Sequence, residues 1–122
     1  MRNWIALALA GMLGVLARHL VQTAVPRFGG FPWGTFAVNV TGAFAVGLVA
    51  GLLAHRLDTP MWIQEAVIVG FLGGYTTFST FSLETVLLMD RGRCVTAAVY
   101  SFGTLTAGVS AVIFGGWLGR AM

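Results

Sequence analysis

Gly70-Phe71-Leu72-Gly73-Gly74-Tyr75-Thr76-Thr77-Phe78-Ser79-Thr80-Phe81-Ser82 is the stretch of this chain that decides its fold. It lies inside an apolar segment that is long enough to cross a bilayer, yet glycine and hydroxyl residues weaken a helix at that depth. Unpaired backbone groups are tolerated in a membrane only where protein buries them or where they line a wet cavity or an ion site. The stretch therefore predicts a broken transmembrane helix, and broken helices are where membrane proteins often bind ions.

The composition of the chain indicates an integral membrane protein. Hydrophobic residues make up 57% of it and charged residues only 9%, whereas a soluble domain carries about a quarter charged residues. We therefore expect the lipid bilayer as its surroundings. The arginines form no basic patch, so nucleic acid is not an expected partner. A single cysteine, Cys94, excludes an intrachain disulfide, and zinc-ligand spacing is absent.

Four apolar spans predict an all-α membrane protein whose residues 1–122 form one four-helix transmembrane domain. The spans are residues 3–25, 35–54, 63–89 and 95–118. The third exceeds the ~20 residues that a straight span needs, which favours an interruption. Tryptophans lie near the ends of the spans, as an interfacial belt requires. Three glycine pairs at i, i+4 spacing favour close helix packing, although apolar membrane helices are also simply rich in glycine.

The arginines give almost no orientation signal. Four spans put both termini on one side, which carries Arg2, Arg56 and Arg120. The opposite loops carry Arg27, Arg91 and Arg93. This balance fits either a weakly biased protein or dual topology, in which copies insert both ways. An antiparallel dimer with a two-fold axis in the membrane plane would also give a small chain room for a pathway.

Two stripes of polar side chains indicate a polar track between helices. Thr77, Thr80 and Glu84 share a helix face through their i, i+3, i+7 spacing. A second stripe, with i, i+4, i+8 spacing on the fourth span, consists of Thr96, Tyr100 and Thr104. A single threonine is readily explained by a bond to its own helix. Two stripes together are not expected to face lipid.

Two other polar residues in the spans have both a structural and a functional interpretation. Asn39 lies early in the second span, where an unbonded amide is expensive. It either joins two helices or presents an amide donor to a pathway. Arg18 lies near the end of the first span. It either anchors the helix at the headgroups or forms a positive vestibule that concentrates anions.

Phe78 and Phe81 form an i, i+3 aromatic pair within the deciding stretch. Spacing alone would assign them to core packing. An aromatic ring is positive at its edge, however, so rings turned edge-on to a pore can contact a small anion. A full positive charge could instead hold the anion too tightly to release it.

Three stretches carry a resemblance to a known family. They are Gly14-Val15-Leu16-Ala17-Arg18, Gly34-Thr35-Phe36-Ala37-Val38-Asn39-Val40-Thr41-Gly42-Ala43-Phe44-Ala45-Val46-Gly47 and Gly73-Gly74-Tyr75-Thr76-Thr77-Phe78-Ser79-Thr80-Phe81-Ser82-Leu83-Glu84. The third resembles a highly specific signature. Over essentially its whole length, the chain resembles the Fluc (CrcB) fluoride channels.

The resemblance implies a passive fluoride channel in the inner (plasma) membrane, formed by an antiparallel, dual-topology homodimer with two pores. It implies that Phe78 and Phe81 face the pore. It further implies an anion path that Asn39, Tyr100 and Thr104 contact. Ser79 and Thr80 would form a polar track with Glu84. Finally, the resemblance implies a structural sodium ion at the dimer centre, held by backbone carbonyls of Gly73 and Thr76 from each subunit.

Three other classes of function can be weighed against this one. A proton-coupled small-molecule antiporter of the small four-helix type would need a membrane-embedded carboxylate, for which Glu84 is the only deep candidate. A non-transporting assembly subunit would not need a broken helix or polar stripes. An enzyme is not expected, because the sequence offers no nucleophile–base set and no cluster of metal ligands.

Overall fold

Four long apolar helices dominate the computed structural model, which describes residues 3–56 and 58–122. The membrane-spanning segments are Trp4–Ala24, Trp33–Leu53, Met61–Asp90 and Cys94–Ala121. They confirm the predicted four transmembrane helices, and their ends differ from the predicted ends by less than one turn. All regular elements within the described residues are helices. That residues 1–122 form a single domain stays a prediction.

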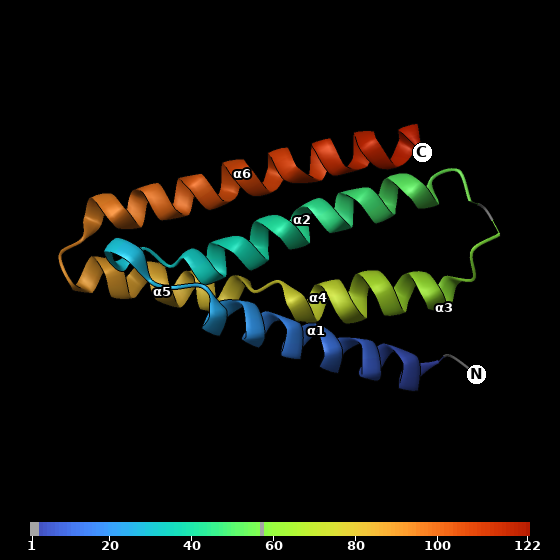
Figure 1. Cartoon of the computed structure of the whole chain (residues 1–122), viewed down its shortest axis with the longest axis horizontal. Coiled ribbons are helices and arrows are strands. Elements are labelled where there is room, and N and C mark those ends of the chain that lie inside the picture. The colour runs from blue at the N-terminus through green and yellow to red at the C-terminus, as the bar shows by residue number, and fades with distance from the viewer. Residues whose placement is uncertain (1–2, 57) are drawn as a thin grey trace.

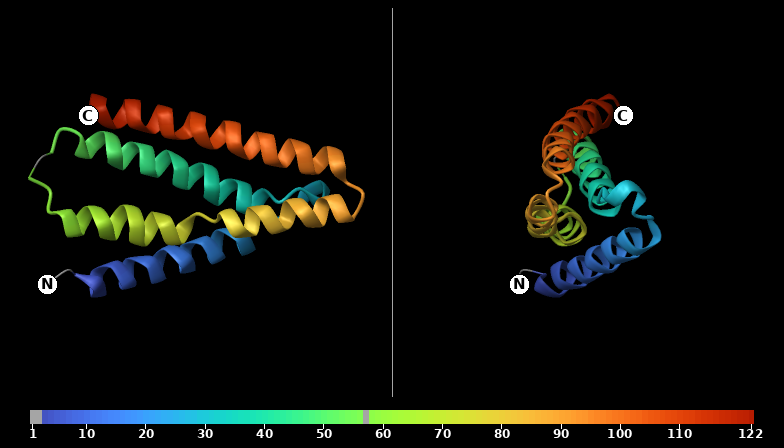
Figure 2. Two further views of the ribbon diagram at one scale, coloured as in Figure 1. Left: turned by 180° about the vertical axis from the view of Figure 1, so that it is seen from behind. Right: turned by 90° about the vertical axis from the view of Figure 1, so that its left-hand side faces the viewer.

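The elements follow one another as a simple up-and-down bundle (Figure 1). In chain order they are α1 (Trp4–Ala24), η1 (Phe28–Gly30), α2 (Trp33–Leu53), α3 (Met61–Gln64), η2 (Glu65–Leu72), α4 (Gly73–Tyr75), α5 (Phe78–Asp90) and α6 (Cys94–Ala121). The start of α1 and the end of α6 lie at the same end of the bundle. Helices α1 and α6 form its opposite edges, with α2 and the third span between them (Figure 2).

The third span is interrupted at Thr76 and Thr77, within the stretch where the sequence predicted a break. Thr76 has φ −80° and ψ 158°, and Thr77 has φ −150° and ψ 115°, so both are extended. The break is narrower than predicted, because the glycines before it stay helical. Gly70 and Gly74 lie against α1, where an added Cβ would come within 2.9 Å of the Leu7 carbonyl oxygen and 2.6 Å of the Gly11 carbonyl oxygen, respectively.

The segment before the break is a π-helix, which the sequence did not predict. It covers Glu65–Leu72 and is continuous with α3 and α4. Its wider turn is visible in the bond from the Gly73 amide to the Ile68 carbonyl, five residues earlier. π-helical turns are rare and occur frequently at functional sites.

Helices α2 and α6 pack closely along their length through facing glycines. A Cβ added to Gly47 would lie 2.2 Å from the Val112 carbonyl oxygen, and one added to Gly115 would lie 2.3 Å from the Phe44 carbonyl oxygen. Small residues allow this approach of two backbones, which replaces hydrophobic burial as a packing force in lipid. The glycine pairs therefore pack the helices of this bundle.

Most large apolar side chains point outward, as expected of a protein surrounded by lipid. Among the residues that the structure describes, the few buried hydrophobic ones are Val38, Leu72, Leu88, Ala97 and Tyr100. Leu88, Ala97 and Tyr100 form a small cluster with rings that include Phe31 and Phe81. This cluster joins α5, α6 and the α1–α2 connection on one side of the break.

The glycine contacts predict a position-specific loss of stability. Gly47→Ala places a methyl group on a backbone oxygen that cannot move aside, and we expect it to destabilise the bundle by about 1–3 kcal/mol. Gly103→Ala is the matched control, because its added Cβ would meet nothing within 4 Å. Thermal unfolding of the purified protein in detergent measures both. Equal midpoints for the two variants would contradict this packing role.

Candidate ion pathway

The break in the third span is held by one side chain from α2. The Asn39 Oδ1 accepts a hydrogen bond from the Thr77 amide at 2.8 Å, and the Asn39 Nδ2 donates to the Thr77 carbonyl at 3.1 Å. One carboxamide thus pairs both backbone groups of an extended residue within the membrane. Thr77 is 5% exposed, so neither group could rely on bulk water. We call this arrangement the Asn39 clamp.

The clamp changes the hydrogen bonding of the carbonyls before the break. In a continuous helix the Thr77 amide would donate a hydrogen bond to the Gly73 carbonyl, but here it donates to Asn39. The Thr80 amide would likewise donate to the Thr76 carbonyl in a continuous helix, but here it donates to the Thr77 hydroxyl at 3.2 Å. Gly73 and Thr76 therefore present neutral oxygens without their helical donors, and Gly73 is exposed on the protomer surface. Such oxygens suit a hard cation.

The residue after the break opens a new helix in the middle of the span. Thr77 is the N-cap of α5: its hydroxyl accepts from the Thr80 amide and lies 3.0 Å from the Thr80 hydroxyl. The Ser79 hydroxyl lies 3.4 Å away on the exposed side. A helix N-terminus carries a partial positive charge. Because α5 begins in the middle of the span, this partial charge lies deep in the membrane, where bulk water cannot stabilise an anion.

A groove of about 360 Å³ runs beside this helix start, between α2, α5 and α6. We call it the phenylalanine groove. Its polar lining consists of Asn39, Thr76, Thr77 and Thr104, its rings are Phe78 and Phe81, and its apolar lining consists of Ala43, Leu105, Gly108, Val109 and Val112. The two ring centroids lie 5.8 Å apart with the planes tilted by 40°. Phe78 is 79% exposed, so this wall of the groove is open in a single protomer.

Thr104 adds a hydroxyl to the groove that has no internal partner. Its Oγ1 is buried and makes no hydrogen bond within the described part of the chain. Buried polar atoms in proteins are nearly always paired. The Thr104 hydroxyl therefore keeps an unused donor and acceptor beside the groove.

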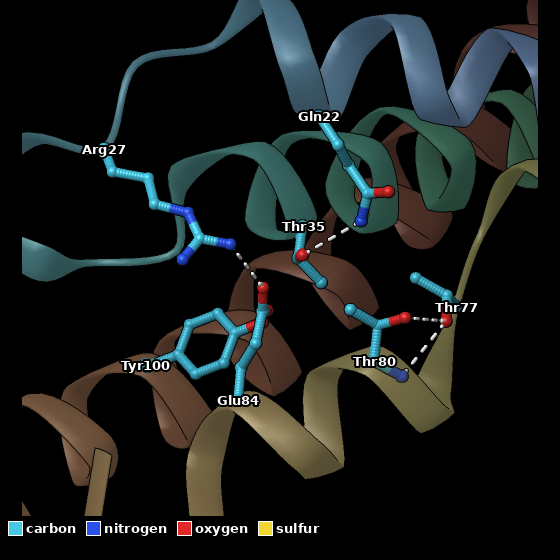
Figure 3. A network of polar contacts seen from close by, with 7 residues as sticks. All are labelled: Gln22, Arg27, Thr35, Thr77, Thr80, Glu84 and Tyr100. Carbon is cyan, nitrogen blue, oxygen red and sulfur yellow. Dashed lines mark hydrogen bonds and ion pairs between the residues drawn. The ribbon is translucent and has the colours of Figure 1, made fainter. Parts of the chain in front are cut away.

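A second, smaller cavity of about 210 Å³ lies among α1, the α1–α2 connection, α2 and α5, and we call it the Glu84 cavity. Its polar lining consists of Gln22, Thr23, Arg27, Thr35, Thr80 and Glu84. Gln22 Nε2 donates to the Thr35 hydroxyl at 3.1 Å across the cavity (Figure 3). The Tyr100 hydroxyl donates to Glu84 Oε2 at 2.8 Å, and Arg27 lies 3.8 Å from Glu84 Oε1.

Two threonines connect the groove and the cavity. Thr77 lines the phenylalanine groove and Thr80 lines the Glu84 cavity. Their hydroxyl oxygens are 3.0 Å apart, and Figure 3 shows both beside the break. Hydroxyl groups therefore follow the same face of α5 from the break to the carboxylate, the face that the sequence spacing indicated.

The structure brings most of the sequence-predicted site residues together but separates two of them. Arg18 is half-buried on α1, outside the linings of both cavities, and Ser79 approaches the track only through Thr77. Sequence reasoning missed four polar residues of the Glu84 cavity, namely Gln22, Thr23, Arg27 and Thr35. Thr35 lies one turn before Asn39 and could have been found by that spacing. Gln22 and Arg27 carry no comparable signal.

Comparison with known proteins places the whole chain in one family. Residues 5–116 match the family model described as CrcB-like protein, Camphor Resistance (CrcB). A protein from Nitrobacter winogradskyi named fluoride-specific ion channel FluC is 45% identical over 91% of this chain and 90% of its own length. One of the same name from Agrobacterium fabrum is 41% identical over 98% of both chains. With a family model and relatives that span nearly all of its length, this chain belongs to the CrcB family.

Proposed function

We propose that the chain is a fluoride channel that exports fluoride passively through two pores of an antiparallel, dual-topology homodimer. Its relatives carry the name fluoride-specific ion channel, which supports an ion channel and not an enzyme. With four apolar spans, it is a multi-pass protein of the plasma membrane. The observation that carries the proposal is the start of α5 beside the phenylalanine groove.

Fluoride holds its water tightly, so a channel must replace that water with closely spaced donors. The groove combines the positive end of α5 with an unpaired Thr104 hydroxyl and two rings. Ring edges add weak positive potential without a full charge. These weak, neutral contacts together stabilise a small anion along the groove, and because none is a full charge the anion can leave.

The proposed path uses the residues that the family resemblance implied. Phe78 and Phe81 face the anion in the groove, together with Asn39 and Thr104. Tyr100, which lies outside the groove lining, would contact the path through its hydroxyl at Glu84. Asn39 holds the break with one of its two amide hydrogens, and the other remains available to the path. The hydroxyl track of Ser79 and Thr80 leads to Glu84, and Arg18 contributes positive potential at the vestibule.

A second copy of the chain completes the site in this proposal. Phe78 is 79% exposed, and a ring that is to line a pore needs a facing wall. Each copy would bring one groove, so a two-fold dimer has two pores. Because the arginines do not favour one orientation, the two copies can insert in opposite directions.

The alternative, a proton-coupled antiporter, requires an exchange carboxylate that is available to substrate. Glu84 is poorly suited to this task, because Tyr100 and Arg27 engage its two oxygens. Efflux of fluoride against chloride from liposomes that contain the purified protein separates the two classes. A channel releases fluoride without a proton gradient.

The two phenylalanines should be needed for this efflux. Phe78→Ile and Phe81→Ile keep the apolar volume roughly constant, and we expect each to lower fluoride efflux by about two- to tenfold, if an edge-on contact to the anion is as strong as the about 0.5–1.5 kcal/mol of an edge-to-face contact between two rings. Phe114→Ile, which removes a ring outside the groove, serves as the control and should conduct normally. Undiminished flux in a folded double variant would refute the role of the rings.

Copies in cells should show both orientations. Phe28, in the α1–α2 connection, is 70% exposed, so a cysteine at this position should react readily. In a Cys94→Ser background, Phe28→Cys should give one population that reacts with an impermeant thiol reagent from outside and one that reacts only after permeabilisation. Labelling of a single population would contradict dual topology.

We further propose that a sodium ion joins the two subunits at the break. The Gly73 and Thr76 carbonyls fit it, because they have lost their helical donors and are neutral. The described residues contain no group of three or more His, Cys, Asp or Glu side chains that could attract a divalent ion. Four carbonyls, two from each copy, would bind the ion away from both pores, where it would stabilise the dimer.

A crystal structure of the dimer in sodium salt tests this site. We expect density on the two-fold axis, coordinated by Gly73 and Thr76 oxygens at distances typical of sodium. Replacement of sodium by a larger cation such as potassium should lower the thermal stability of the dimer. Carbonyls that bond only water or side chains in a resolved dimer would exclude the ion.

A further inference from the structure

Glu84 poses an electrostatic problem for any anion that enters the Glu84 cavity. Its side chain is only 15% exposed, and it belongs to a membrane-spanning segment. A negative charge repels an anion more strongly in a partly dry site than in water. An anion path through this cavity therefore needs a group that compensates the carboxylate.

The structure offers one cation for this purpose. Both oxygens of the carboxylate are engaged, Oε2 by the Tyr100 hydroxyl at 2.8 Å and Oε1 by Arg27 at 3.8 Å. Tyr100 supplies a dipole, whereas Arg27 supplies a full charge. Among the described residues that line the cavity, Arg27 is the only cationic side chain.

The contact between Arg27 and Glu84 is loose. At 3.8 Å it exceeds the length of a hydrogen bond, and the Arg27 side chain is 77% exposed. The guanidinium can therefore turn from the carboxylate toward the cavity mouth without exposing buried surface. With five donors, it can also bond the carboxylate and an anion together.

We propose that Arg27 is the charge-compensating residue of the anion entrance, which neutralises Glu84 and binds a small hydrated anion at the mouth of the Glu84 cavity. The inference rests on the proposed function of the channel. It assigns the entrance to the α1–α2 connection, whereas the position of Arg18 near the end of the first span had suggested a vestibule at that residue. Arg18 lies outside the lining of this cavity.

The first test removes the charge and keeps a hydrogen-bonding side chain. We expect Arg27→Gln to slow fluoride efflux from liposomes by about tenfold, the low end of what charge-lined entrances contribute to association rates. Arg27→Lys should stay within about twofold of the unmodified protein. The matched control is Arg91→Gln, which removes an exposed charge in the turn after α5, at the same end of the bundle.

The outcomes separate this inference from the function on which it rests. An unmodified protein without fluoride efflux would overturn the channel itself. Efflux that Arg27→Gln leaves unchanged, or that Arg91→Gln slows as much, would overturn only the role of Arg27. In the latter case the effect would come from the general surface potential.

A second test varies the charge on one and the same protein. Arg27→Cys in a Cys94→Ser background is modified in detergent before reconstitution, so that both orientations react. A trimethylammonium-ethyl thiosulfonate should restore efflux, and a sulfonatoethyl thiosulfonate should reduce it further. The Cys94→Ser protein treated in the same way should not respond. Equal effects of the two reagents on the cysteine variant would overturn the inference, because they would show that charge is not what matters.

Discussion

The pairing of the Thr77 backbone with Asn39 is the interaction on which the rest of this structure depends. An extended residue in a bilayer leaves its amide without a helical partner, which costs several kcal/mol, and its carbonyl keeps a free lone pair even where, as at the N-cap Thr77, it accepts the first bond of the next helix. A carboxamide is the side chain that can satisfy both, because it has a donor and an acceptor at one end. Asn39 does so from α2. The break in the third span therefore depends on α2, because Asn39 reaches the Thr77 backbone only when α2 packs beside it.

The break gives the segments before and after it partial charges of opposite sign. Before it, carbonyls of Gly73 and Thr76 have lost their helical donors, and after it α5 begins with a partial positive charge. A cation and an anion can thus be stabilised within a few residues of each other without any ionised side chain. Neutral groups are suited to conduction, since they bind an ion less tightly than a full charge would.

Hydropathy was sufficient to predict the four spans, and the glycine- and hydroxyl-rich stretch predicted a break, which the structure places at Thr76 and Thr77. The glycines were misjudged as helix breakers because sequence alone does not show which backbone each one faces. Gly70 and Gly74 stay helical and face α1. The π-helix was also not predicted, because the apolar sequence of Glu65–Leu72 has no feature that distinguishes it from an α-helix.

The candidate site was predictable only where its residues share one helix. Thr77, Thr80 and Glu84 follow a helical spacing, and they do lie along one face of α5. The Glu84 cavity, by contrast, is assembled from α1, the α1–α2 connection and α2. Gln22 and Arg27 reach it through tertiary contacts, which no local pattern encodes.

The exposure of the site residues links the chemistry of the groove to assembly. Phe78 and Gly73 belong to the proposed anion and cation sites, yet both are exposed in the protomer. In lipid, apolar burial gives little drive for association, so close packing and shared polar groups must hold two copies together. In the proposed dimer the carbonyls at the break would meet that need, because pairing them through a cation would stabilise only an assembly in which two breaks face each other. In the proposed dimer, the helix break thus has two roles. It places the positive end of α5 beside the groove, and its carbonyls favour association with a second copy of the same chain.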